Sequence, residues 1–358
     1  MACAAWRYVT GDESGSGIAG YRARSSRVAR RRREMATAVA AASYLDSLES
    51  LIGAVIAPAA SETDSAGTFP RAALDALGAA GLLGLVSARE VGGLGEGHRA
   101  AAHVVERIAR SCASTAMIVC MHYAAAAVVE AHGPMAARRD VAAGRALATL
   151  AFSEAGSRSH FWAPVSTAAV DGDAVRLDAH KSWITAAGEA DLYVWSSRPL
   201  AAEGASTLWL VPASAEGLRV GGAFDGLGLR GNASSPVLAE GVRVPIDAML
   251  GADGAGFGVM MGVVLPYFNV MSAAMCPGKW RRRPARLRRM PQAPSSRILA
   301  SRWRSCRRFG PISPACGSRP TWCMGCLRIL SPGWKGGARI RCCACWRRRR
   351  RRARHPRR

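Results

Sequence analysis

Two short segments of this sequence combine aromatic and hydroxyl side chains closely enough to act together. Residues 148–160, ATLAFSEAGSRSH, place Phe152 beside Ser153, and residues 181–191, KSWITAAGEAD, place Trp183 two positions before Thr185. An apolar surface with a few hydroxyl groups can hold a flat cofactor ring, which needs an apolar slot and a small number of hydrogen bonds. Taken alone, Trp183 is better explained as a core tryptophan, and the hydroxyls as strand groups bonded to backbone.

Other reactive side chains are distributed unevenly along the chain. No Asp or Glu follows Asp253, so the residues after it offer no carboxylate that could act as a general base. Eight of the eleven cysteines lie at or beyond Cys276. They include one C-x-x-C pair and an irregular second cluster: Cys323, Cys326, Cys342, Cys343 and Cys345. This spacing is a weak signal for zinc, and we predict no metal site.

Basic residues are concentrated at the two ends of the chain. Residues 276–358 hold 26 of the 49 Lys and Arg residues, five Trp and no acid, and residues 1–34 hold eight basic and three acidic residues. Residues 35–275 hold 15 basic and 22 acidic residues, as an ordinary soluble enzyme does. This middle part has two cysteines and no signal peptide precedes it, which predicts a reducing, cytoplasmic setting.

The two basic ends allow several interpretations, and we predict that both are disordered. Residues 1–34 have the composition of a transit peptide, but a true start at Met35 is favoured. The arginines and tryptophans of residues 276–358 could bind nucleic acid, and the cysteines could bind zinc. A shifted reading frame in GC-rich DNA is favoured over both, because it explains the abrupt boundary and the absence of acids together.

Between the ends, the sequence predicts helices first and strands second, which indicates an α+β fold with segregated domains. Residues 44–60 repeat apolar side chains at helical spacing, at Leu45, Leu48, Ile52 and Ile56. After residue 150, a hairpin about Asp171–Gly172 and several short apolar runs predict a β-barrel-like or sandwich domain. The 19 uncharged residues 111–129 predict a buried core helix in preference to a membrane span.

Four segments together resemble the acyl-CoA dehydrogenase family, in the right order and at the right spacing. They are residues 69–95, 148–160, 181–191 and 226–257. The resemblance implies an N-terminal helical domain (35–150), a middle β domain (151–253) and the start of a helical domain (254–275), with the C-terminal helical bundle missing. It also implies FAD as cofactor, an acyl-CoA substrate, a flavoprotein as electron acceptor and a homo-oligomer.

The resemblance also assigns roles to individual residues. It implies that Trp183, followed by Ile184, covers one side of the flavin ring, and that Thr185 reaches N5. Ser153 takes the family's Thr position at the pyrimidine edge, with Phe152 against the ring. Ser159 corresponds to the loop serine near the cofactor phosphates and the substrate thioester.

Departures from the family pattern affect the substrate end of the predicted site. Ala155, Arg158 and His160 replace the family's Pro, Gly and Asp, and Arg158 is assigned with Ser159 to the substrate. Asn269 stands at about the position of a substrate-binding Arg. No residue matches the catalytic glutamate, which the family usually supplies from its C-terminal helices.

These departures predict impaired activity and poor folding, because the apolar surface that faces the missing helices is uncovered. They also leave open a flavin-dependent monooxygenase of the same fold. A third hypothesis, in which the tail binds nucleic acid, is disfavoured by the same argument that favours a shifted frame.

Overall fold

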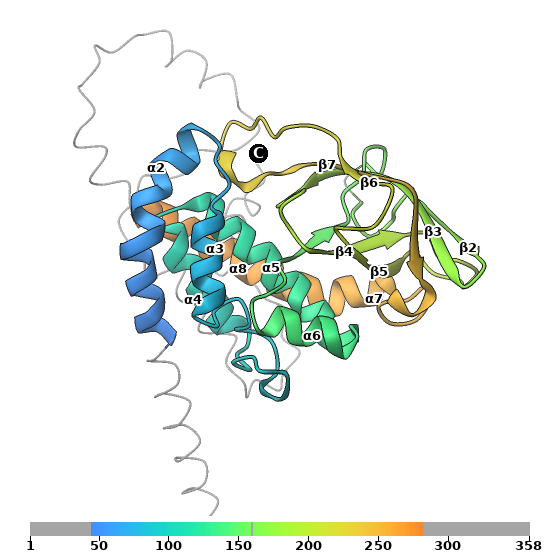
Figure 1. The fold of residues 1–358 in the computed structure, drawn as a ribbon, viewed down its shortest axis with the longest axis horizontal. Helices are drawn as coiled ribbons and strands as arrows, with labels where there is room; N and C mark the ends of the chain where they lie inside the picture. The colour runs from blue at the N-terminus through green and yellow to red at the C-terminus, as the bar shows by residue number, and fades with distance from the viewer. Residues whose placement is uncertain (1–43, 159, 282–358) are drawn as a thin grey trace, which may run out of the picture. The chain divides into compact units, whose positions relative to one another are not determined.

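The computed structural model describes residues 44–158 and 160–281, in which a helical part precedes a β part (Figure 1). The predicted basic extension and residues 282–358 lie outside the described residues, as does Ser159. The structure confirms the predicted mixture of helices and strands, with the helices first.

The helical part begins with one continuous helix whose buried face was predicted from spacing. Residues 44–51 are helical and continue through η1 (Ile52–Ile56) into α2 (Ala57–Ser65). Leu48, Ile52 and Ile56 are buried in the core, and Leu45 packs against it. The next helices are α3 (Arg71–Ala79), α4 (His98–Ala109), α5 (Ala113–His132) and α6 (Met135–Ala142), with the short η2 (Arg89–Val91) before α4.

The helix α5 is the predicted core helix, and most of its side chains are buried. It begins at the N-cap Cys112, whose Sγ accepts a hydrogen bond from the Thr115 N–H at 3.5 Å, and it ends at Gly133, next to Pro134. Its buried His122 ties three segments together, because Nε2 donates to Leu83 O at 3.0 Å and Nδ1 accepts from the Ala148 N–H at 3.1 Å.

The β part consists of two sheets. The three-stranded sheet has the order β1 (Ala148–Ala151), β4 (Leu192–Ser197), β5 (Thr207–Pro212), with β1 parallel to β4. The antiparallel four-stranded sheet has the order β2 (Thr167–Asp171), β3 (Ala174–Ile184), β7 (Ser235–Pro245), β6 (Leu218–Val220). The short helices η3 (Arg230–Asn232) and η4 (Ile246–Ala248) flank β7.

The predicted hairpin and strand alternation are both present. Asp171 pairs with Ala174 across a tight turn in which Gly172 takes a φ of 66°, a conformation that favours glycine. Val175 and Leu177 are fully buried, whereas Arg176 between them is exposed. The alternation ends before the strand does, because the pairing of β3 with β7 shifts register between Lys181 and Ile184.

After the β part, the chain returns to the helical part. α7 (Gly256–Val259), η5 (Met260–Val264) and α8 (Leu265–Arg281) form one continuous helix, which crosses the predicted boundary at Cys276 and packs against α4 and α5. Two described helices, Ala113–His132 and Gly256–Cys276, are long and apolar enough to cross a membrane. The first is 78% buried within the fold and the second 33%, so Gly256–Cys276 has an open apolar face.

Candidate functional site

The two predicted segments lie side by side in the structure. The loop after β1 runs along the end of β3, where the Ser182 N–H donates to Ser153 O at 2.9 Å and Glu154 bridges to Lys181. Phe152 is buried, and Ser153 is exposed. Side chains that are about 30 positions apart in sequence are thereby brought to one edge of the β part.

A register shift turns Trp183 out of the sheet. Trp183 has a φ of 59°, its side chain is 69% exposed, and its ring meets the edge of Phe224 at 6.4 Å between centroids. An exposed indole on strained backbone is not a core tryptophan, which corrects the interpretation that Trp183 alone would favour. Ile184 is instead buried, so it can offer a ligand its backbone groups only.

The hydroxyl of Thr185 is held from both sides of the strand. Thr149 Oγ1 donates to Thr185 O at 2.8 Å, and Thr185 Oγ1 lies 3.2 Å from Ser234 Oγ. All three side chains are buried. The sequence analysis did not single out Ser234, although it lies within the family-like segment 226–257 and directly precedes β7, the partner strand of β3.

A buried ion pair lies directly beneath these segments. Lys181 Nζ lies 2.5 Å from Glu154 Oε1, and both side chains are almost completely inaccessible to solvent. Lys181 also lies over the Trp195 ring, 5.0 Å from its centroid. Sequence reasoning missed this pair, although both residues belong to the quoted motifs.

Burial and pairing act in opposite directions on the two charges. Burial lowers the pKa of the Lys181 ammonium to about 8, while Glu154 works to raise it. Burial is also the largest influence on Glu154 and favours its neutral form. Lys181, the Ser166 hydroxyl and the Val165 N–H together outweigh burial and hold the pKa of the carboxyl below its usual range. The pair is therefore ionised near neutral pH.

The strained backbone of the described residues is concentrated around this site. The non-glycine residues with positive φ are Arg158, Trp183, Ala186, Leu229 and Ala233. The last three belong to neighbouring loops, since the N–H groups of Ala186 and Ala187 donate to the carbonyls of Asn232 and Ala233 at 2.9 and 3.0 Å. Strain of this kind persists where the surroundings enforce it, and it collects at functional sites.

The helical part holds the same loops through two ion pairs. Arg71 at the start of α3 donates to Glu189 O at 2.7 Å and to its Oε2 at 2.6 Å. Arg230 on η3 bonds to both the carbonyl and the carboxylate of Asp64. The site is therefore fixed between helices and strands.

The predicted substrate residues lie at different places. Arg158 and His160 are exposed in the loop after Glu154, where the His160 ring lies 5.1 Å from that of Trp162. Asn269 is exposed on α8, the helix that packs against α4 and α5. Ser159 lies outside the described residues, and these assignments stay predictions.

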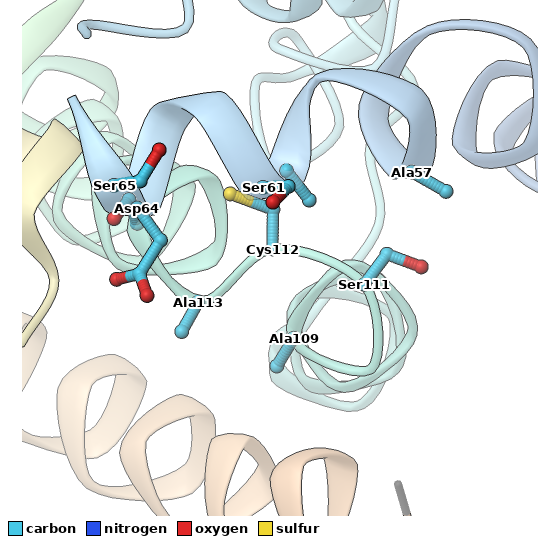
Figure 2. A pocket seen from close by; sticks show the side chains of 10 residues that line it. Ala57, Ser61, Asp64, Ser65, Ala109, Ser111, Cys112 and Ala113 are labelled. Atoms are coloured by element: carbon cyan, nitrogen blue, oxygen red, sulfur yellow. The ribbon is translucent and has the colours of Figure 1, made fainter. Parts of the chain in front are cut away.

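A cavity of about 490 Å³ lies elsewhere, between α2 and the turn from α4 to α5 (Figure 2). Most of its lining side chains are small: Ala57, Ala60, Ser61, Asp64, Ser65, Ala109, Ser111, Cys112, Ala113 and Ser114. None of them belongs to the two segments, so this cavity is separate from the candidate site. Within residues 44–158 and 160–281, no cluster of three or more His, Cys, Asp or Glu could hold a metal ion.

The local geometry fits a flavin in three respects. Trp183 offers an exposed flat ring, Ser153 an exposed hydroxyl beside it, and Thr185 a hydroxyl fixed in position. Together these supply an apolar surface and a few hydrogen-bonding groups, as a flat cofactor requires.

Two family models match the chain. Residues 41–145 match "Acyl-CoA dehydrogenase, N-terminal domain", and residues 149–242 match "Acyl-CoA dehydrogenase, middle domain". The two matches together cover more than half of the chain, and the second contains both segments of the candidate site.

Curated relatives agree with these matches. The mitochondrial short-chain specific acyl-CoA dehydrogenase of Homo sapiens is 32% identical over 212 residues, which are 57% of this chain and 51% of that protein. A probable acyl-CoA dehydrogenase of Mycobacterium leprae is 30% identical over 208 residues, 56% of this chain and 54% of that protein. The chain therefore spans about half the length of the curated relatives it matches.

Solved structures show the same fold. FkbI, described as acting in biosynthesis of a methoxymalonyl extender unit, matches with a TM-score of 0.60 and 29% identity, over 71% of this chain and 73% of that chain. Butyryl-CoA dehydrogenase from Megasphaera elsdenii matches with a TM-score of 0.63 and 19% identity, over 81% and 74%. The second likeness concerns the fold alone.

Proposed function

The chain belongs to the acyl-CoA dehydrogenase family, and from this premise we propose that it is a FAD-dependent oxidoreductase for an acyl-CoA thioester. When bound, FAD supplies the acceptor for the hydride that leaves the β-carbon as the α-proton is removed. The observation that carries the proposal is the meeting of Ser153, Trp183 and Thr185 at one edge of the β part. Relatives named as short-chain specific favour a short acyl chain.

The described residues bind and orient in this proposal. Trp183 presents its exposed ring to one face of the flavin, and Ser153 offers its hydroxyl to the pyrimidine edge. Thr185 places its hydroxyl toward N5, and Ser234 fixes the direction of that hydroxyl from 3.2 Å away. An oriented hydrogen-bonding group at N5 costs no reorganisation when charge develops there.

We propose further that turnover is impaired in this chain. Removal of the α-proton needs an acceptor within hydrogen-bond reach, and no carboxylate follows Asp253. The open face of helix Gly256–Cys276 supports the related prediction of poor folding, because an uncovered apolar surface favours aggregation. A soluble, monodisperse preparation with stoichiometric FAD would contradict that prediction.

The decisive experiment titrates the purified chain with FAD and then adds butyryl-CoA without oxygen. We expect FAD to bind and Trp183→Leu to weaken binding by roughly tenfold. The matched control is Phe257→Leu, since Phe257 is an exposed aromatic residue on α7, outside the two segments. Bleaching of the flavin would show dehydrogenation, and failure to bind FAD would overturn the proposal.

The second candidate is a flavin-dependent monooxygenase, favoured by Arg158 and His160 in the loop at the substrate end. Such an enzyme needs flavin that another reductant has reduced. Butyryl-CoA would then leave the bound flavin oxidised, whereas a chemical reductant followed by oxygen would give rapid reoxidation. Transfer of electrons from butyryl-CoA to an electron-transferring flavoprotein would instead decide for the dehydrogenase.

A further inference from the structure

The ion pair of Glu154 and Lys181 lies where several parts of the site meet. Glu154 directly follows Ser153, and Lys181 precedes Trp183 by two positions. Lys181 belongs to β3 of the four-stranded sheet, yet its Nζ donates to Ser196 O at 2.6 Å and to Ser196 Oγ at 3.0 Å on β4 of the other sheet. One side chain therefore links both sheets to both segments.

The carboxylate of Glu154 closes the loop that follows it. Oε2 accepts from the N–H groups of Val165 and Ser166 at 2.6 and 3.0 Å, and Oε1 accepts from Ser166 Oγ at 2.6 Å. These bonds fix both ends of the loop 154–166. The loop's position relative to β3 and β4 thus depends on the charge pair.

A buried ion pair is an inefficient means of stabilising a fold. Taking two charges out of water is costly, and apolar replacements of similar volume are often as stable. Here both side chains are inaccessible, and each has a full set of partners. What the pair does specify is one arrangement of the groups attached to it.

We propose that Glu154 and Lys181 are positioning residues for the cofactor, which hold the Phe152–Ser153 and Trp183–Thr185 segments in a single arrangement. The proposal rests on the proposed function, since these segments are the proposed flavin contacts. The hydrogen bond from the Ser182 N–H to Ser153 O joins the segments at the same point. Loss of the pair releases the loop at Val165 and Ser166 and separates the two sets of flavin contacts.

The test uses the full chain and the double variant Glu154→Gln/Lys181→Met, which leaves neither charge unpaired. We expect its thermal unfolding midpoint to stay close to that of the parent, while the Kd for FAD rises about tenfold. Amide exchange at Ser182, Val165 and Ser166 should quicken by a similar factor, and exchange in β5 should not change. The control variant is Arg219→Met/Glu240→Gln, which removes an exposed ion pair on β6 and β7.

An unchanged Kd for FAD together with unchanged exchange at the three amides would overturn the proposal. If the double variant does not fold, Ser166→Ala decides, because it removes the hydroxyl that bonds Glu154 and keeps both charges. An increase in Kd and in loop exchange supports the proposal, and parental values of both contradict it. If the parent chain binds no FAD, the proposed function fails, while exchange in the cofactor-free variants still decides whether the pair holds the segments.

Discussion

His122 in the helical part and Lys181 in the β part are both fully buried, but the fold keeps one neutral and the other charged. His122 bridges two backbone groups, and its Nδ1 must stay unprotonated to accept the Ala148 N–H. Lys181 faces a carboxylate and bonds to a loop that carries the proposed flavin contacts. The helical part therefore uses a polar group to join backbone segments without charge, whereas the β part accepts the cost of charge beside its site.

The largest effect should come from unpairing the charges of the β part. Lys181→Met leaves Glu154 as an uncompensated buried carboxylate, and we expect the free energy of unfolding to fall by about 3–5 kcal/mol. Urea denaturation followed by circular dichroism measures this loss. Adding Glu154→Gln should restore most of the stability, and a single variant as stable as the double would show that water reaches the pair.

The buried histidine should make the helical part sensitive to acid. Burial lowers the pKa of His122 to about 4, from 6.5 in the unfolded chain, so the unfolded state binds more protons between these values. Stability should therefore be full above pH 6.5 and fall by about 3 kcal/mol as the pH drops to 4.

The pH effect is isolated by comparing the parent with His122→Gln in urea denaturation at several pH values. The variant loses the titrating group, so the difference in stability between the two proteins should shrink as the pH falls. A difference that stays constant from pH 7.5 to pH 4.5 would contradict a neutral buried His122.

Between these two cases lies Asp253, a charged group that is only partly buried. Its carboxylate accepts from the N–H groups of Leu200, Ala201 and Ala202 and from Thr207 Oγ1. Burial opposes ionisation, but the hydrogen bonds outweigh it and hold the pKa of Asp253 well below its usual range. Asp253→Asn should lower the free energy of unfolding by about 1–2 kcal/mol, measured at pH 7. The loss should disappear in acid, where the parent carboxyl is also neutral.

The features predicted correctly from sequence are those set by local period and turn chemistry. Leu48, Ile52 and Ile56 follow the helical repeat, Val175 and Leu177 the strand repeat, and each set is buried in the structure. Such patterns need no knowledge of what the segment packs against.

The features that were missed depend on pairing between distant residues. Glu154 and Lys181 are 27 positions apart, and in sequence they resemble ordinary surface charges. Trp183 leaves the strand repeat because of a register shift against β7, which the sequence of β3 alone does not reveal. The resemblance placed Trp183 and Thr185 at a flavin, but the support beneath them could be found only in the fold.

The smallest effect should arise at Ser234, which the β part uses as a neutral partner, as the helical part uses His122. Ser234→Ala removes the hydroxyl 3.2 Å from Thr185 Oγ1 and should cost about 0.5–1 kcal/mol of stability. With Thr185 free to rotate, we expect a changed visible spectrum of bound FAD at nearly unchanged affinity. The control is Ser235→Ala, the adjacent buried serine that begins β7. If both variants shift the spectrum equally, the effect comes from loosened packing of the strand, and Ser234 does not orient Thr185.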